Sequence, residues 1–118
     1  MWLFSYLWGG NYIKKFEIVK EHKDFDNIIA SGKYKKNKYF ILYNKESSFD
    51  HPRFGIAVGK KVGNAVIRNK LKRQYRMLIT NNKKLFSNNQ DYIIIVKRSS
   101  LDTSFSNLNL ELRRTLEK

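Results

Sequence analysis

The stretch FGIAVGKKVGNAVIRNKLKRQYRMLIT, residues 54–80, contains the change from a strand to a long helix. Residues 54–59 are β-branched, aromatic or small, which predicts a strand. Asn64 suits the N-cap of a helix, and apolar residues then recur every three or four positions, so the spacing predicts an amphipathic helix over 64–80. The run YIIIV, residues 92–96, predicts a strand buried on both faces. Together these segments predict a β-α-β unit.

Three further segments extend this unit toward both ends of the chain. Residues 23–30 carry apolar side chains at helical spacing, and residues 39–43 are the β-branched and aromatic types of a strand. Leucines at four-residue steps predict a last helix over 101–118. The order helix, strand, strand, helix, strand, helix predicts a single small α/β or α+β sandwich with a mixed sheet. The general rule for β-α-β units predicts a right-handed crossover.

Length and composition limit what this chain can be. Its 118 residues allow one domain, and 42% hydrophobic with 14% aromatic residues is enough for a modest core. There is no cysteine, which excludes disulfides, thiolate zinc sites and cysteine nucleophiles and fits a reducing compartment. With 24 Lys and Arg against 10 Asp and Glu, the net charge of +14 indicates a polyanionic partner.

The positive charge is concentrated in one part of the sequence. No acidic residue occurs between Asp50 and Asp91, a window that holds ten Lys and Arg. Within helix 64–80, pairs such as Arg68 and Lys72 place like charges four residues apart, which costs a few tenths of a kcal/mol in an isolated helix. Phosphate binding gives a reason for this cost, because neutralised phosphates release counterions. A solvated basic helix face is the alternative, and the missing acids favour nucleic acid over it.

The sequence shows no pattern for chemistry carried by the polypeptide. His22 and His51 stand in polar surroundings without a partner motif, and no metal-binding or nucleotide-binding motif occurs. Two classes of function remain open at this point. One is a subunit of an RNA-dependent enzyme, and the other is a non-catalytic RNA-binding module such as a ribosomal protein or an RNA chaperone.

The first 12 residues, MWLFSYLWGGNY, are apolar and aromatic. They lack the basic start and the small-residue cleavage site of a signal peptide, and they are too short to span a bilayer. An extension ahead of the domain is the expected role, and an anchor at a membrane surface is the alternative. We therefore expect a cytoplasmic protein with no membrane partner.

Residues 60–76, KKVGNAVIRNKLKRQYR, closely resemble the signature of the bacterial ribonuclease P protein component. The family pattern is K-K-x-G-N-A-V-x-R-N-x-x-K-R-x-x-R, and every fixed position is present. The resemblance covers roughly residues 13–117, which defines residues 13–118 as the expected RNA-binding domain and 1–12 as the extension. It also implies a left-handed β-α-β crossover, against the general rule.

The resemblance implies a cytoplasmic ribonucleoprotein that removes the 5′ leader of precursor tRNA. The catalyst in that family is the RNA subunit, and the Mg²⁺ ions are bound by that RNA and the substrate. The expected partners of this chain are therefore the ribonuclease P catalytic RNA and precursor tRNA, with no obligatory protein partner. No catalytic residue and no metal ligand is expected on the polypeptide.

The resemblance also implies site residues on two surfaces. Those expected to bind the RNA subunit are mostly basic: Lys60, Lys61, Asn64, Arg68, Asn69, Lys70, Lys72, Arg73 and Arg76. Lys70 stands where the family usually has arginine, which keeps the charge but loses a bidentate fork.

Phe25, Ile29 and Tyr43 match the positions that line the family's cleft for the single-stranded leader. Ile29 stands where an aromatic residue is frequent, so base stacking is not expected at that position. From the residues alone, Phe25 and Tyr43 are equally suited to an ordinary hydrophobic core.

Overall fold

The structure is a computed structural model that describes residues 17–19 and 21–117. Its helices and strands follow in the order α1 (His22–Ser31), β1 (Lys33–Lys36), β2 (Phe40–Glu46), β3 (Arg53–Val58), α2 (Ala65–Asn81), β4 (Gln90–Val96) and α3 (Phe105–Glu117). Short 3-10 helices η3 (Lys60–Val62), η4 (Lys83–Leu85) and η5 (Arg98–Asp102) connect them. All six predicted elements are present, and β1 is an additional strand. The predicted extension, residues 1–12, lies outside the described residues.

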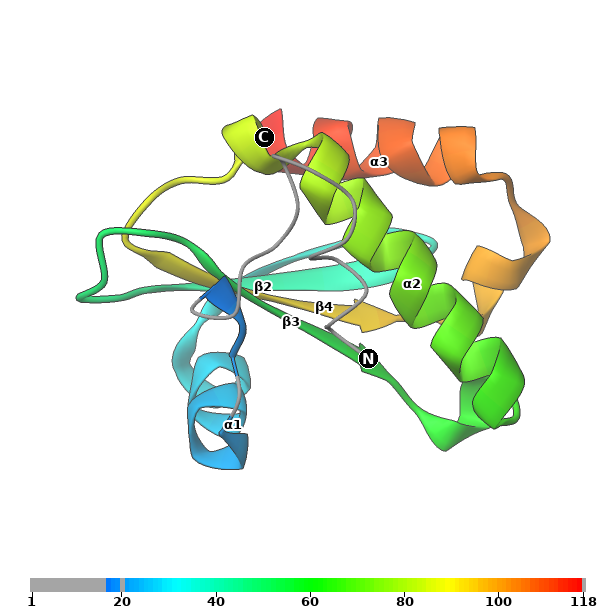
Figure 1. The fold of residues 1–118 in the computed structure, drawn as a ribbon, viewed down its shortest axis with the longest axis horizontal. Helices are drawn as coiled ribbons and strands as arrows, with labels where there is room; N and C mark the ends of the chain where they lie inside the picture. The colour runs from blue at the N-terminus through cyan, green and yellow to red at the C-terminus, as the bar shows by residue number, and fades with distance from the viewer. Residues whose placement is uncertain (1–16, 20, 118) are drawn as a thin grey trace.

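The four strands form one mixed sheet in the order β1-β2-β4-β3. Strand β4 pairs antiparallel with β2 and parallel with β3, and β1 pairs antiparallel with β2 at one edge. Helices α2 and α3 cover one face of the sheet, and α1 lies on the opposite face (Figure 1). The domain is thus an α/β sandwich, as its sequence pattern predicts, and the structure adds that helices cover both faces of the sheet.

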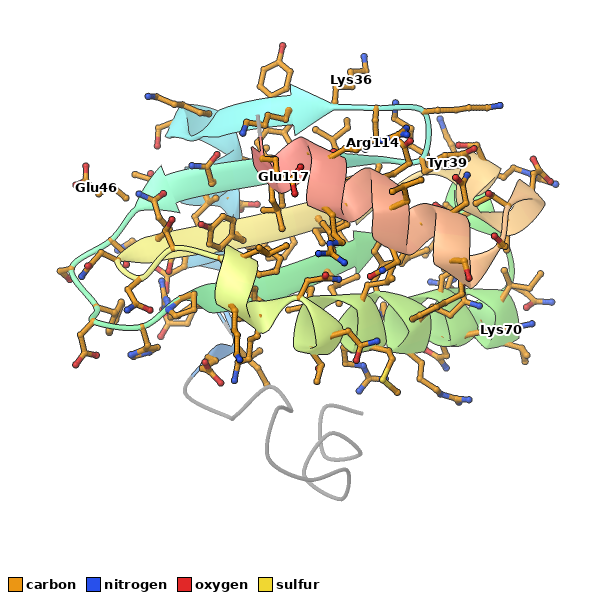
Figure 2. All side chains as sticks on the ribbon, turned by 90° about the horizontal axis from the view of Figure 1, so that it is seen from above. Lys36, Tyr39, Glu46, Lys70, Arg114 and Glu117 are labelled. Atoms are coloured by element: carbon orange, nitrogen blue, oxygen red, sulfur yellow. The ribbon has the colours of Figure 1, made fainter. Side chains whose placement is uncertain are left out.

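The β3-α2-β4 crossover is left-handed. Figure 2 looks onto the face that carries α2 and α3, with β3 and β4 running from left to right and β4 above β3. The chain leaves β3, returns through α2 on the viewer's side and enters β4. Seen along the direction of the strands, this path runs counterclockwise, which is a left-handed crossover. The resemblance predicted this hand, and the general rule, which holds for about 98% of such units, is wrong here. Insertion of β4 between β2 and β3 pairs both edges of an apolar strand, and this strand order together with the face on which α2 packs sets the hand.

The main core lies between the sheet and the helices α2 and α3. Leu71, Tyr75 and Leu78 of α2 are buried in it, as the helical spacing predicts. Phe54, Phe86 and Tyr92 form an aromatic group with ring centroids 4.9 to 6.0 Å apart. Burial of this face holds the basic side of α2 outward.

A smaller cluster lies on the other face of the sheet, under α1. Val19, Ile28 and Ile93 are buried in it, and side chains at its border are half-buried. This cluster fixes the position of α1 across β2 and β4.

Strand β1, with the sequence KYKK, was not predicted because three of its four residues are lysines. Lysine is common on edge strands, where its charge discourages pairing with a further chain. The strand exists because β2 offers a free edge, with Lys33 opposite Asn44 and Tyr34 opposite Tyr43. Short-range sequence patterns do not show such an edge.

A buried hydrogen-bond chain ties α2 to the start of β2. Ser100 Oγ donates to the Tyr39 carbonyl oxygen at 2.9 Å, so the hydroxyl of Tyr75, 2.7 Å from Ser100 Oγ, acts as the donor to it. Burial raises the pKa of Tyr75 from 10.0 to about 12, and the bond to Ser100 opposes this.

We predict that Tyr75→Phe changes the alkaline stability of the domain. Between pH 10 and 12 the unfolded chain loses the Tyr75 proton while the folded chain keeps it, so the free energy of unfolding falls as pH rises. Tyr75→Phe should cost about 1 kcal/mol at neutral pH and should show a shallower fall above pH 10. Denaturant unfolding of the wild type and Tyr75→Phe across this range measures the two free energies of unfolding. Parallel curves of this free energy against pH would contradict the assignment of a raised pKa to Tyr75.

Candidate nucleic-acid interface

The N-terminus of α2 is built by Asn64 and Gly63. Asn64 Oδ1 accepts a hydrogen bond from the Ile67 backbone N–H at 3.0 Å, which confirms the predicted N-cap. A Cβ atom at Gly63 would lie 2.9 Å from Ile67 Cγ2, so glycine lets the chain pass close under this side chain. This tight turn brings Lys60 and Lys61 of η3 beside the first turn of α2.

The predicted RNA-binding residues gather along η3 and the outer side of α2, and we call them the basic surface. Those that are exposed are Lys60, Lys61, Asn64, Asn69, Lys70 and Arg73. Arg68 and Lys72 are half-buried, and Arg76 is buried. Lys70 lies at the N-terminal end of α2 in Figure 2.

Most cations of the basic surface form no ion pair with a carboxylate of the described residues. Among residues 17–19 and 21–117, the ion pairs are formed by bases outside this surface. None joins a carboxylate to Lys60, Lys61, Arg68, Lys70, Lys72 or Arg73. Arg68 Nε is also shielded from solvent without a hydrogen-bond partner in this part of the chain. A buried donor left unpaired costs roughly 1–3 kcal/mol, and an anionic oxygen would remove that cost.

Arg76 differs from the rest of the basic surface because its residue is only 6% exposed. Burial lowers the pKa of its guanidinium, and the nearby charge of Arg73 lowers it further. The helical spacing predicts an outward position, but the structure buries this residue. Its contact with RNA stays a prediction.

The three residues predicted to line a leader cleft lie together on the other face of the sheet, and we call them the aromatic patch. Phe25 and Ile29 come from α1 and Tyr43 from β2, and all three are half-buried at the border of the cluster around Ile93. A Cβ atom at Gly55 would lie 2.9 Å from Phe25 Cε2, so the Phe25 ring lies against the backbone of β3.

Arg53 fixes α1 on the sheet next to the aromatic patch. Its Nε and Nη2 donate to the two carboxylate oxygens of Asp91 at 2.8 and 2.6 Å, and its Nη1 lies 3.5 Å from Asp24 Oδ2 on α1. The hydrogen bonds to Asp91 raise the pKa of Arg53, and its guanidinium lies 4.5 Å from the centre of the Phe49 ring. The sequence places Arg53 in the basic window, but the β3–β4 register pairs it with Asp91 instead.

Sequence reasoning also missed Tyr34 on the edge strand. It lies opposite Tyr43, with the two ring centroids 5.6 Å apart, and its residue is 63% exposed. An aromatic residue between lysines was the available signal, but its place beside Tyr43 depends on the pairing of β1.

The described part of the chain holds no group of three His, Cys, Asp or Glu side chains close enough to bind a metal ion. None of the helices in this part combines the length and the hydropathy needed to cross a bilayer.

A comparison with protein families matches residues 13–118 to the ribonuclease P family. The chain belongs to this family. The ribonuclease P protein component of Mycoplasma capricolum is 36% identical over 107 residues, covering 90% of this chain and 98% of that protein. The component from Streptococcus pyogenes is 37% identical over 106 residues, covering 89% and 87%.

Solved structures of the ribonuclease P family share the fold. A mutant of the Staphylococcus aureus ribonuclease P protein superposes with a TM-score of 0.80 at 33% identity, covering 87% of each chain. The Thermotoga maritima protein gives 0.77 at 30% identity, covering 85% of this chain and 94% of that one. The chain is therefore a protein component of ribonuclease P, the enzyme that cleaves tRNA precursors.

We predict that Arg53→Ala strongly destabilises the domain. Asp91 is 6% exposed, and loss of Arg53 leaves its carboxylate buried without its charged partner, which typically costs about 3–5 kcal/mol. Thermal or denaturant unfolding measures this change. Arg114→Ala is the matched control, because the exposed Arg114–Glu111 pair should contribute under about 0.5 kcal/mol. Equal effects of the two substitutions would contradict a stabilising role for the buried Arg53–Asp91 ion pair.

Proposed function

We propose that this chain binds the ribonuclease P RNA through the basic surface and holds the 5′ leader of precursor tRNA on the aromatic patch. The observation that carries the proposal is that Arg68, Lys70, Lys72 and Arg73 of α2 form no ion pair with a carboxylate of the described residues, and that Arg68 Nε is shielded from solvent. Packing of the opposite side of α2 into the main core keeps these cations outward at a fixed spacing. RNA phosphates supply the missing negative charge, and arginine matches their geometry with bidentate hydrogen bonds.

The aromatic patch suits a single strand more than a duplex. Unpaired bases stack on aromatic rings in a largely sequence-tolerant way, and each stacked base contributes about 1–3 kcal/mol. Phe25 and Tyr43 supply the rings, and Ile29 supplies an apolar contact beside the same cluster. The leader is the single-stranded part of the substrate, so it is the RNA segment that this patch fits.

Mg²⁺ bound by the RNA subunit and substrate supplies the Lewis-acid chemistry of leader hydrolysis in this proposal. Among the described residues, no group of three His, Cys, Asp or Glu side chains could hold such an ion. The chain's contribution is to bind and orient: the basic surface offsets the repulsion between two RNA backbones, and the patch holds the leader on one side of the cleavage site.

We place this ribonucleoprotein in the cytoplasm, without an obligatory protein partner, and assign RNA binding to residues 13–118. The extent of the family match and the absence of cysteine support this placement. Residues 1–12 are left as an extension without an assigned role.

Cleavage of precursor tRNA by a bacterial ribonuclease P RNA at low Mg²⁺ tests the proposal. Adding this protein should raise cleavage, and Arg73→Ala should weaken binding to the RNA subunit. The slope of log affinity against log salt should become shallower by about 0.7 to 0.9 for each phosphate that the variant no longer neutralises. Lys84→Ala, an exposed cation on η4 outside the basic surface, is the control and should change little. No gain in cleavage with the wild-type protein would refute the proposed function.

Tyr43→Ala tests the aromatic patch separately. It should weaken the affinity of the reconstituted enzyme for precursor tRNA by about 5-fold or more, because the substitution removes a ring on which one base stacks, and should leave the affinity for mature tRNA unchanged. Equilibrium binding with the two RNAs measures the difference. The same loss for both RNAs would place Tyr43 in the hydrophobic core alone.

A further inference from the structure

Tyr34 extends the aromatic patch to the edge of the sheet. Strand register places it directly opposite Tyr43, so the two side chains leave the same face, and their rings are tilted by 40° with centroids 5.6 Å apart. At 63%, Tyr34 is the most exposed aromatic residue in the described part of the chain. A cross-strand pair alone would explain the contact with Tyr43, but it leaves most of the Tyr34 ring uncovered.

Lys36 stands next to Tyr34 on the same face, because side chains two residues apart in a strand point the same way. It is exposed, and no carboxylate among the described residues forms an ion pair with it. An aromatic ring with a neighbouring cation is the combination that binds one nucleotide of a single strand, the base by stacking and the phosphate by charge. Lys33, on the same strand, points to the opposite face.

The order of the strands gives Tyr34 its place along the RNA. The Phe25 ring lies over Gly55 of β3, Ile93 of β4 follows, then Tyr43 of β2 and Tyr34 of β1. The basic surface begins at η3, which directly follows β3. If the RNA subunit lies on the basic surface, the 3′ end of the leader, which adjoins the cleavage site, lies at the β3 side. A leader that crosses the sheet from there reaches Tyr34 on the 5′ side of Tyr43.

We propose that Tyr34 and Lys36 form an additional leader-binding position, which takes a nucleotide on the 5′ side of the one held at Tyr43. This proposal rests on the proposed function, because it requires the leader to lie on the aromatic patch. Its consequence is that leaders long enough to reach β1 bind more tightly than shorter ones.

Precursor tRNAs whose leaders grow by one nucleotide at a time test this position in the reconstituted enzyme. Tyr34→Ala should lower the affinity about 5-fold or more once the leader reaches β1, and should not change it for shorter leaders or for mature tRNA. Tyr34→Phe keeps the ring and should bind like the wild type. Phe105→Ala, a partly exposed ring on α3 across the sheet, should have no length-dependent effect.

Lys36→Ala provides a second measurement that does not depend on the ring. It should make the slope of log affinity against log salt shallower by about 0.7 for long leaders only, which is the value for one phosphate of a single strand. Lys33→Ala is the matched control, an exposed lysine on the same strand that faces away.

The outcomes separate this proposal from the one on which it rests. If Tyr43→Ala shows a leader-dependent loss and Tyr34→Ala shows none at any length, the additional position is refuted and the proposed function stands. If neither substitution discriminates precursor from mature tRNA, both fail. A Tyr34→Ala protein that unfolds more easily but binds all leaders like the wild type would show that the ring only stabilises the sheet.

Discussion

The rest of the structure depends on burial of strand β4 on both faces and its pairing at both edges. Its apolar run needs partners on every side, because unpaired backbone groups in a dry interior are costly. Insertion between β2 and β3 meets that need, and with α2 on the face that it covers the crossover is left-handed. It also divides the domain into a large core under α2 and α3 and a small cluster under α1. The large core holds in place α2, which carries most of the basic surface, and the small cluster holds α1 against β2, where the aromatic patch lies.

The basic surface shows how charge and packing act together. Like charges along one side of α2 oppose helix formation by a few tenths of a kcal/mol per pair, whereas burial of one large apolar side chain contributes about 1.5–3 kcal/mol. Packing therefore wins, and the cations stay outward. Asn64 sets where the helix begins, and the apolar residues that pack into the core determine the side on which each cation lies. Arg76 departs from this pattern, since it is buried.

Much of the fold and part of the site could be predicted from the sequence. The periods of apolar residues predicted six elements, and the signature over residues 60–76 predicted the family and the hand of the crossover. Arg53 was counted within the basic window because its partner Asp91 is distant in sequence and adjacent only through the β3–β4 register. Strand β1 was missed because its lysine-rich sequence has no strand pattern of its own, and the place of Tyr34 was missed with it.

The sequence by itself determined six of the helices and strands, the net charge of +14 with its concentration in one segment, and the identity of the family. These depend on local periodicity and on residue types at fixed spacing. Only the tertiary structure decided which cations are neutralised, how deeply Arg76 is covered and which aromatic rings share a face. These features depend on the pairing of distant strands. A one-residue change in register would turn Tyr34 away from Tyr43, and no pattern within β1 alone specifies that register.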